Sequence, residues 1–332
     1  MKKISVILSA LILAAAFSGC SLFGGDDDPE SVNALNNQIA NLEQQLESVR
    51  AETTTHMEFK SRDSIILRDA TPAVSVAIEA REEAMADMQE TVMICGVSYS
   101  TELTSMTIPS GNFGNRDIEN LKYMVNLEEL QIYQNNISDI SPITGLTNLY
   151  VLTIFGNDIS DLTPLAGLTR LSALYMRSNN IRDISPLDGL FELTILDLAH
   201  NDISDLSPLN NLSEMTLLRL NDNSISNLRG LSNMPHLKRL HLQDNQISSI
   251  SNIMGLTSLE ELYIDHNLVT NLEPLRGMTS IRWLKIGDNP ITDISVLATL
   301  TELRKVYLEN LNLGPTAVAD LHSALPRCEI IV

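Results

Sequence analysis

The sequence predicts an α/β solenoid with a parallel β-sheet on its concave face, short 3-10 or irregular segments on its convex side, and an N-terminal helical stalk and cap. Two observations predict it. An asparagine recurs at a 22-residue step from Asn135 to Asn289, and a fixed short period is typical of stacked repeats. Aromatic residues make up only 4% of the 332 residues, which suits thin repeated layers better than one large core.

The charge of the chain narrows the classes of partner. Its formal net charge is -20 at pH 7, and a strongly acidic surface repels nucleic acid and anionic lipid while it favours solubility. We therefore expect no nucleic-acid partner and no membrane contact through the folded body.

The first element is a secretory signal. Lys2 and Lys3 precede a short apolar run at 4–17, a pattern typical of exported bacterial proteins and too short to span a membrane stably. The run ends in Phe17-Ser18-Gly19-Cys20.

This ending resembles the lipobox of bacterial lipoproteins. The resemblance implies that residues 1–19 are removed and that Cys20 is lipidated. Ser21 follows where an aspartate would signal inner-membrane retention, so the resemblance implies an outer-membrane anchor, on a side that the sequence leaves open. The alternative is an ordinary signal peptide with an incidental cysteine.

Residues 20–30 and 31–60 are expected to form a lipidated tether and a coiled-coil stalk. The tether is rich in Gly and Asp, which favours a flexible chain. In the stalk, apolar residues alternate at spacings of three and four, the seam of a coiled coil. The seam consists of Val32, Leu35, Ile39, Leu42, Leu46 and Val49. So short a helix is marginal alone, so it either self-associates or packs within the chain.

A helical N-terminal cap is predicted at 61–94, with a helix over 72–92. Pro72 opens that stretch, and proline is favourable in the first turn of a helix. A cap is needed because the first repeat would otherwise expose its apolar end and an unpaired strand edge.

The repeats are predicted over 95–314. The first clear copy reads Leu127-x-x-Leu130-x-Ile132-x-x-Asn135-x-Ile137-x-x-Ile140-x-Pro142-Ile143-x-x-Leu146. The asparagine returns at Asn157, Asn179, Asn201, Asn223, Asn245, Asn267 and Asn289. This pattern resembles the leucine-rich repeat in its internalin-like 22-residue class. The resemblance extends to the 72–96 region, which is similar to the N-terminal caps of bacterial leucine-rich-repeat proteins.

Each repeat position has a physical reason. Alternate apolar residues of the Leu-x-x-Leu-x-Leu segment point inward from a strand, and the asparagine amide can bond backbone groups of its own and neighbouring turns. Short aspartates such as Asp139 are expected to cap the convex turn, where prolines such as Pro142 fix φ. We interpret all of these residues as structural.

Residues 315–332 are predicted to form a C-terminal cap, with a helix over 315–325 and a strand over 328–332. Leu311 stands where the next ladder asparagine is due, so the repeat ends there. Cys95 and Cys328 flank opposite ends of the array, roughly 45 Å apart at ~4.8 Å per strand. Because a disulfide needs Cα atoms within about 7 Å, we expect two free, largely buried thiols.

The solvent-facing strand positions are the candidate partner-binding residues. Aromatic and arginine residues dominate protein-binding hot spots, and the core is already filled by Leu and Ile. The candidates are Tyr133, Phe155, Tyr175, Arg177, Asp197, Arg219, His241, Tyr263, Asp265, Trp283, Lys285 and Tyr307. The alternative is that the aromatics only shield the sheet. In internalin-like proteins the concave face is the usual docking surface for proteins, and the resemblance implies the same here.

A cation site is a second hypothesis for the row before the ladder asparagines. Its candidate ligands are Asp222, Asp244, His266 and Asp288, with His200 in the preceding repeat; carboxylates and imidazoles bind divalent cations. The alternative is a solvated acidic turn row, and we expect no resident metal or cofactor.

The sequence holds no catalytic motif of a familiar kind, neither Gly-x-Ser-x-Gly nor His-Glu-x-x-His nor a phosphate-binding Gly-rich loop. We therefore expect a binding protein rather than an enzyme, with a protein ligand through the concave face. Two other functions stay open: a structural envelope lipoprotein that oligomerises through its coiled coil, and a carbohydrate-binding surface protein.

Overall fold

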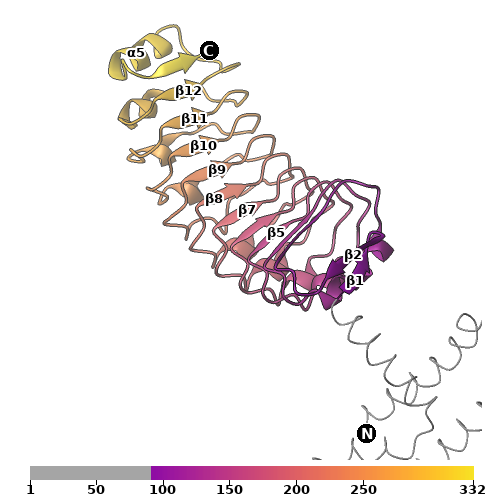
Figure 1. Cartoon of the computed structure of the whole chain (residues 1–332). Coiled ribbons are helices and arrows are strands. Elements are labelled where there is room, and N and C mark those ends of the chain that lie inside the picture. The colour runs from indigo at the N-terminus through magenta and orange to yellow at the C-terminus, as the bar shows by residue number, and fades with distance from the viewer. Residues whose placement is uncertain (1–90) are drawn as a thin grey trace, which may run out of the picture. The chain divides into compact units, whose positions relative to one another are not determined.

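The computed structural model describes residues 91–332, so the predicted signal, tether, coiled-coil stalk and most of the helical cap lie outside the described residues. Eleven strands form one sheet in the order β13 to β3. Its neighbouring strands pair in parallel, as the repeat predicts. Figure 1 shows the strands stacked one above the next along the array.

The strands are short and regularly spaced. They are β3 (Ser105–Ile108), β4 (Glu129–Ile132), β5 (Val151–Thr153), β6 (Ala173–Tyr175), β7 (Ile195–Asp197), β8 (Leu217–Arg219), β9 (Arg239–His241), β10 (Glu261–Tyr263), β11 (Trp283–Lys285), β12 (Lys305–Tyr307) and β13 (Glu329–Ile331). From β4 to β12, each residue pairs with the residue 22 positions later, beginning with Glu129 opposite Val151.

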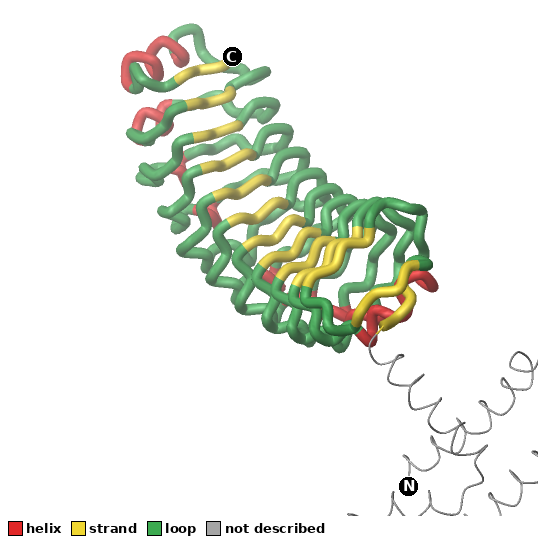
Figure 2. Tube along the Cα trace, in the orientation of Figure 1, coloured by secondary structure: helices red, strands yellow, loops and turns green. Residues whose placement is uncertain are grey.

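Short 3-10 helices make the return on the other side of each repeat, and in Figure 2 they lie along one flank of the strand ladder. They are η2 (Ser141–Ile143), η3 (Thr163–Leu165), η4 (Ser185–Leu187), η5 (Ser207–Leu209), η6 (Ser251–Ile253), η7 (Glu273–Leu275) and η8 (Ser295–Thr299). Asp139 accepts a hydrogen bond from the Ser141 backbone N–H at 2.8 Å, so the expected aspartate cap is present. Proline follows in the first turn of η2.

The core is a stack of Leu and Ile side chains, with Leu152, Leu174 and Leu196 among those with no exposed surface. Beside it runs the asparagine ladder. The Asn201 amide donates to Met176 O of the preceding repeat at 3.2 Å and to Leu198 O at 3.0 Å, and its Oδ1 accepts from the Ile181 N–H at 3.0 Å. The ladder therefore ties each turn to the turn before it, as the sequence predicts.

The N-terminal end contains a hairpin where the sequence predicts the end of a helix. Strand β1 (Thr91–Ile94) pairs antiparallel with β2 (Val97–Ser100), so the expected helix is wrong for residues 91 and 92. The physical reason is the connecting turn, in which Cys95 and Gly96 have φ of 52° and 76°; two central residues with positive φ make a tight hairpin turn. The 3-10 helix η1 (Asn115–Tyr123) lies against β1.

At the other end, helix α5 (Ala317–Ala324) packs beside η8, and β13 adds the last strand to the sheet. Both elements lie where the sequence analysis expects a helix and a strand. Cys328 is buried and Cys95 is half-buried, and both are free thiols. Burial raises the pKa of the Cys95 thiol to about 11.

Candidate docking face of the sheet

The candidate residues lie on the solvent face of the sheet, which we define as the strand side chains that point away from the core. The strand register aligns them in columns, because each pairs with the residue 22 positions later. One column is Gln131, Thr153, Tyr175, Asp197, Arg219, His241, Tyr263, Lys285 and Tyr307. This is the column that the sequence predicts.

The first aromatic cluster lies near the N-terminal end of this face. The rings of Tyr133 and Phe155 stack with centroids 5.4 Å apart and an interplanar angle of 9°. The Arg177 guanidinium lies 4.8 Å from the Phe155 centroid. Both rings are half-buried and Arg177 is exposed, so the cluster offers a flat apolar surface beside a cation.

An ion pair occupies the middle of the face. Arg219 Nη1 lies 3.3 Å from Asp197 Oδ2, and Asp197 Oδ1 accepts from the Ala199 backbone N–H at 3.2 Å. Asp197 is only 4% exposed, so the prediction that it faces solvent is wrong. Its carboxylate is covered because it folds back onto the backbone and onto Arg219. A ligand would therefore meet Arg219 before it meets Asp197.

The second aromatic cluster spans β9 to β12. The rings of His241 and Tyr263 stack with centroids 4.6 Å apart. Lys285 Nζ lies 4.7 Å from the Tyr263 centroid and 5.0 Å from the Tyr307 centroid. An ammonium group close to the face of an aromatic ring is attracted to it, so Lys285 contacts the two half-buried rings of Tyr263 and Tyr307 at once.

Glu261 braces this cluster and was not among the predicted site residues. His241 Nε2 lies 3.1 Å from Glu261 Oε1. Burial lowers the pKa of His241 below its usual range although Glu261 opposes that shift, so the ring is neutral at pH 7. Burial and the hydrogen bond with Glu261 raise the pKa of Tyr263. The sequence signal that identifies Glu261 is its place in the register opposite Arg239 and Trp283.

Gln243 and Asp265 lie two residues after His241 and Tyr263 and are neighbours in the adjoining column. Each has one buried acceptor oxygen. Asp265 Oδ1 and Gln243 Oε1 are buried without a hydrogen-bond partner among the described residues. Burial therefore raises the pKa of the Asp265 carboxyl, against the opposing effects of its own backbone N–H and of Lys285. Because Asp265 is half-buried and its Oδ1 is covered, only part of its carboxylate is open to a ligand.

The proposed cation row has a conformational explanation. Asp222, Asp244, His266 and Asp288 have φ between 50° and 57°, the left-handed region in which Asn, Asp and His are enriched. His266 Nε2 lies 3.5 Å from Asp288 Oδ2, so the polar groups contact each other in pairs. The described residues contain no group of three or more side chains suited to a metal ion, so the cation-site hypothesis receives no support.

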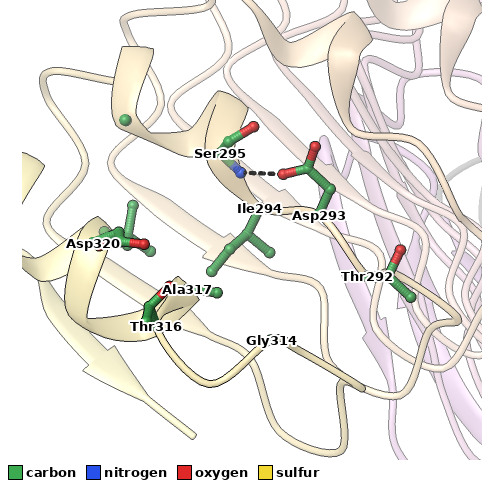
Figure 3. A pocket seen from close by; sticks show the side chains of 10 residues that line it. Thr292, Asp293, Ile294, Ser295, Gly314, Thr316, Ala317 and Asp320 are labelled. Atoms are coloured by element: carbon green, nitrogen blue, oxygen red, sulfur yellow. Dashed lines mark hydrogen bonds between the residues drawn. The ribbon is translucent and has the colours of Figure 1, made fainter.

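Away from the sheet, a cleft lies between η8 and α5 (Figure 3). Its walls carry the carboxylates of Asp293 and Asp320 beside Thr292 and Thr316. Asp293 Oδ1 accepts from the Ser295 N–H at 2.8 Å, which is the repeat's own turn cap. The cleft therefore marks the junction between the last repeat and the C-terminal cap, and we do not interpret it as a functional site.

Comparison with known proteins agrees with this architecture. The family model described as Leucine Rich repeats (2 copies) matches residues 125–167 and 235–277. The chain therefore carries leucine-rich repeats. A search of curated proteins finds no significant match.

Solved structures show the same fold. An internalin (inlF) from Listeria monocytogenes is 25% identical with a TM-score of 0.50, over 71% of this chain and 83% of that one. An internalin C2 (inlC2) from the same organism is 28% identical with a TM-score of 0.53, over 59% and 85%. The plant peptide hormone receptor RGFR1, in complex with RGF2, shares the fold at 23% identity and a TM-score of 0.56, over 64% of this chain and 36% of the receptor. The repeat region is thus structurally similar to internalins.

Proposed function

We propose that this protein binds a protein partner through the solvent face of its sheet, which we take as the concave face of the solenoid. One observation carries the proposal: six aromatic residues occur on that face, although the core is closed by Leu and Ile. Trp283 is 41% exposed. The rings of Tyr263 and Tyr307 both contact the ammonium group of Lys285. Such aromatic and cationic groups supply much of the binding energy at protein interfaces.

The place of action follows from the N-terminal sequence. We propose that Cys20 is lipidated and anchors the chain in the outer membrane of a bacterial envelope, with the repeats held off the bilayer by the stalk. Lys2, Lys3 and the apolar run before Cys20 support this proposal. In the part of the chain that the structure describes, no helix is long and apolar enough to cross a membrane.

The test is crosslinking in intact cells followed by pull-down of the full chain. The wild type is compared with a triple variant, Tyr175→Ala, Tyr263→Ala and Trp283→Ala. We expect the triple variant to lose partner proteins, because truncating a hot-spot aromatic costs about 2 kcal/mol or more. Circular dichroism checks that the variant remains folded.

A matched control removes exposed apolar side chains elsewhere. Tyr123 and Met254 are 53% and 64% exposed and lie outside the solvent face, so Tyr123→Ala with Met254→Ala should retain the partners. An unchanged partner set in the triple variant would overturn the proposal. Self-crosslinks confined to residues 31–60 would instead assign the function to a coiled-coil envelope scaffold, and recovery of glycans alone would assign it to carbohydrate binding.

A further inference from the structure

The solvent face is not uniform in charge. Six of the 22 Lys and Arg residues of the chain lie on the four rows of β9 to β12 or directly before those strands. They are Lys238, Arg239, Arg282, Lys285, Arg304 and Lys305. In a chain of net charge -20, this gathering of cations is a local reversal of sign, and we name these rows the basic half of the face.

The other end of the same face is acidic. Glu129 is the first residue of β4 and Glu128 directly precedes it, and Tyr150 donates a 2.6 Å hydrogen bond to Glu129. A ligand that lies along the columns therefore meets negative charge over β4 and positive charge over β9 to β12. Such complementarity fixes the direction in which a charged partner binds.

Several cations of the basic half lack a carboxylate of their own. Lys238 and Arg282 share Glu260, at 3.7 and 3.5 Å. Arg239 is exposed and forms no ion pair among the described residues. Lys285 has its Nζ between two aromatic rings and makes no salt bridge in the same part of the chain. These groups keep capacity for carboxylates that come from outside.

An apolar anchor point lies within these cations. Trp283 pairs with Lys305 on one side and with Glu261 on the other, and the residue is 41% exposed. Lys305 itself is paired with Glu329, with Nζ 2.9 Å from Oε1, whereas Lys285 of the same strand as Trp283 makes no salt bridge among the described residues. A tryptophan on a strand with such a cation suits a ligand that alternates apolar and anionic side chains. A smooth anionic surface would leave the tryptophan without an apolar contact.

From these observations we propose that the basic half of the solvent face binds an extended acidic peptide segment of the partner protein. The inference rests on the proposed function and names the chemistry of the partner. Arg239 on β9 and Lys285 on β11 lie two strand spacings apart, about 10 Å at ~4.8 Å each. An extended chain advances about 3.3 Å per residue, so carboxylates about three residues apart reach Arg239 and Lys285 together.

The carboxylates within the basic half favour a peptide over an anionic polysaccharide. Glu260 and Glu261 stand among the cations, and Glu309 lies beside them in the adjoining column. A polymer with a charge on every unit would be repelled at each of these positions. A peptide places its carboxylates singly and leaves neutral residues opposite the glutamates.

The test is selection of a random 12-residue peptide library on the full chain. We expect the enriched peptides to carry two or more Asp or Glu residues and an aromatic residue. A synthetic consensus peptide should bind the wild type and weaken as salt is added. Its Asn and Gln analogue should not bind.

Variants locate the site. Arg239→Ser and Lys285→Gln should each weaken the consensus peptide about two- to fivefold, the range for exposed ion pairs, and the double variant should weaken it further. The control is Arg116→Gln, an exposed arginine of η1, which should leave binding unchanged. Circular dichroism verifies folding of each variant.

Any of three peptide results would overturn the proposal: no enriched peptide, enriched peptides without acidic residues, or equal binding of the consensus peptide to the wild type and to the double variant. Heparin-derived oligosaccharide that binds more tightly than the consensus peptide, with the same dependence on Arg239 and Lys285, would also overturn it. The aromatic triple variant separates the two levels of inference. If partners are lost with the aromatic triple variant but retained with the cation double variant, the docking face stands and the acidic ligand class fails.

Discussion

The side chain of a ladder asparagine forms hydrogen bonds with several backbone groups at once. Asn201 is 7% exposed and donates to three carbonyl oxygens, those of Met176, Leu198 and Ala199. Its Oδ1 accepts from the backbone of the preceding repeat. No other side chain of this size offers both donors and acceptors in that geometry, so the recurrence of asparagine is a requirement of backbone bonding.

We expect Asn201→Ala to lower the free energy of unfolding by about 2–4 kcal/mol, because four buried backbone groups lose a partner at roughly 0.5–1.5 kcal/mol each, in part offset by water. Urea unfolding followed by circular dichroism measures the change. Ser204→Ala, at an exposed position of the same repeat, is the control and should change the stability by less than about 0.5 kcal/mol. A loss for Asn201→Ala as small as that of the control would contradict this account of the ladder.

Asp265 makes stability depend on pH in a direction that can be worked out. Burial raises its folded pKa above 3.8, so the folded state binds the proton more tightly than the unfolded state does. Its favourable contribution is therefore present below pH 3.8 and is lost as the pH rises through the folded pKa. At neutral pH the ionised carboxylate is a cost, which includes the unpaired Oδ1.

Asp265→Asn should accordingly stabilise the protein at pH 7 by about 1 kcal/mol, since the amide removes the buried charge and can donate to Gln243 Oε1. The gain should shrink as the pH is lowered from 7 toward 4. Urea unfolding at several pH values measures it, with Asp244→Asn at an exposed position as the control. A gain that stays constant with pH would show that burial of the charge is not its cause.

For single residues, the sequence predicted which side chains align in a column better than it predicted how exposed each side chain is. The 22-residue step aligned the column from Tyr175 to Tyr307 because strand register follows directly from the repeat. It did not predict that Asp197 is covered, because that depends on how the Arg219 side chain folds over it. Spacing likewise could not predict that His266 and Asp288 contact each other as a pair, because it does not show that both residues have a positive φ.

Among the elements, the turn at Gly230 differs from its equivalents. Five of the seven short helices on the convex side have proline as their second residue. Gly230 occupies the equivalent position with φ of 107°, and no helix forms there. An added Cβ would lie 2.1 Å from Leu206 O. The turn is therefore closely packed against the previous repeat, and only a residue without a Cβ fits at this position.

Gly230→Ala should destabilise the protein by about 2–3 kcal/mol, because the substitution adds a backbone clash to a conformation that L side chains rarely adopt. Gly255 offers a matched control, since a Cβ there meets nothing within 4 Å and its Ala variant should be near neutral. Thermal unfolding of both variants measures the difference. Equal melting temperatures would mean that the turn can relax.

The two ends of the array differ in how far sequence could predict them. The C-terminal helix and strand follow from an ordinary helical pattern and a final apolar run. At the N-terminal end, helix propensity was outweighed by Cys95 and Gly96, whose two positive φ values close a hairpin. Cysteine is not a typical residue for such a turn, and that is why the hairpin was missed.

At the scale of the described region, stability is shared between neighbours. The main contacts of the array join equivalent elements of neighbouring repeats, such as β4 with β5 and η2 with η3. In such an array the terminal units have a neighbour on one side only. The ends should therefore open more often than the middle.

Hydrogen exchange followed by mass spectrometry tests this. We expect amides of β6 to β9 to exchange at least about tenfold more slowly than those of β1, β2 and β13, since local opening from an end breaks fewer contacts. Uniform protection from β1 to β13 would show that the array opens as one unit. Strongest protection at the two ends would show that the caps, and not the stacking, dominate.

The constant offset between strands also bears on how the binding face can change over generations. Every pair from β4 to β12 is joined at the same 22-residue step. A gene rearrangement that adds or removes one such unit therefore rejoins Leu to Leu and Asn to Asn, and the core closes as before. The face grows or shrinks by one row of ~4.8 Å and acquires a new set of neighbours. Ligand range can thus shift through the number of repeats, with no substitution in the core.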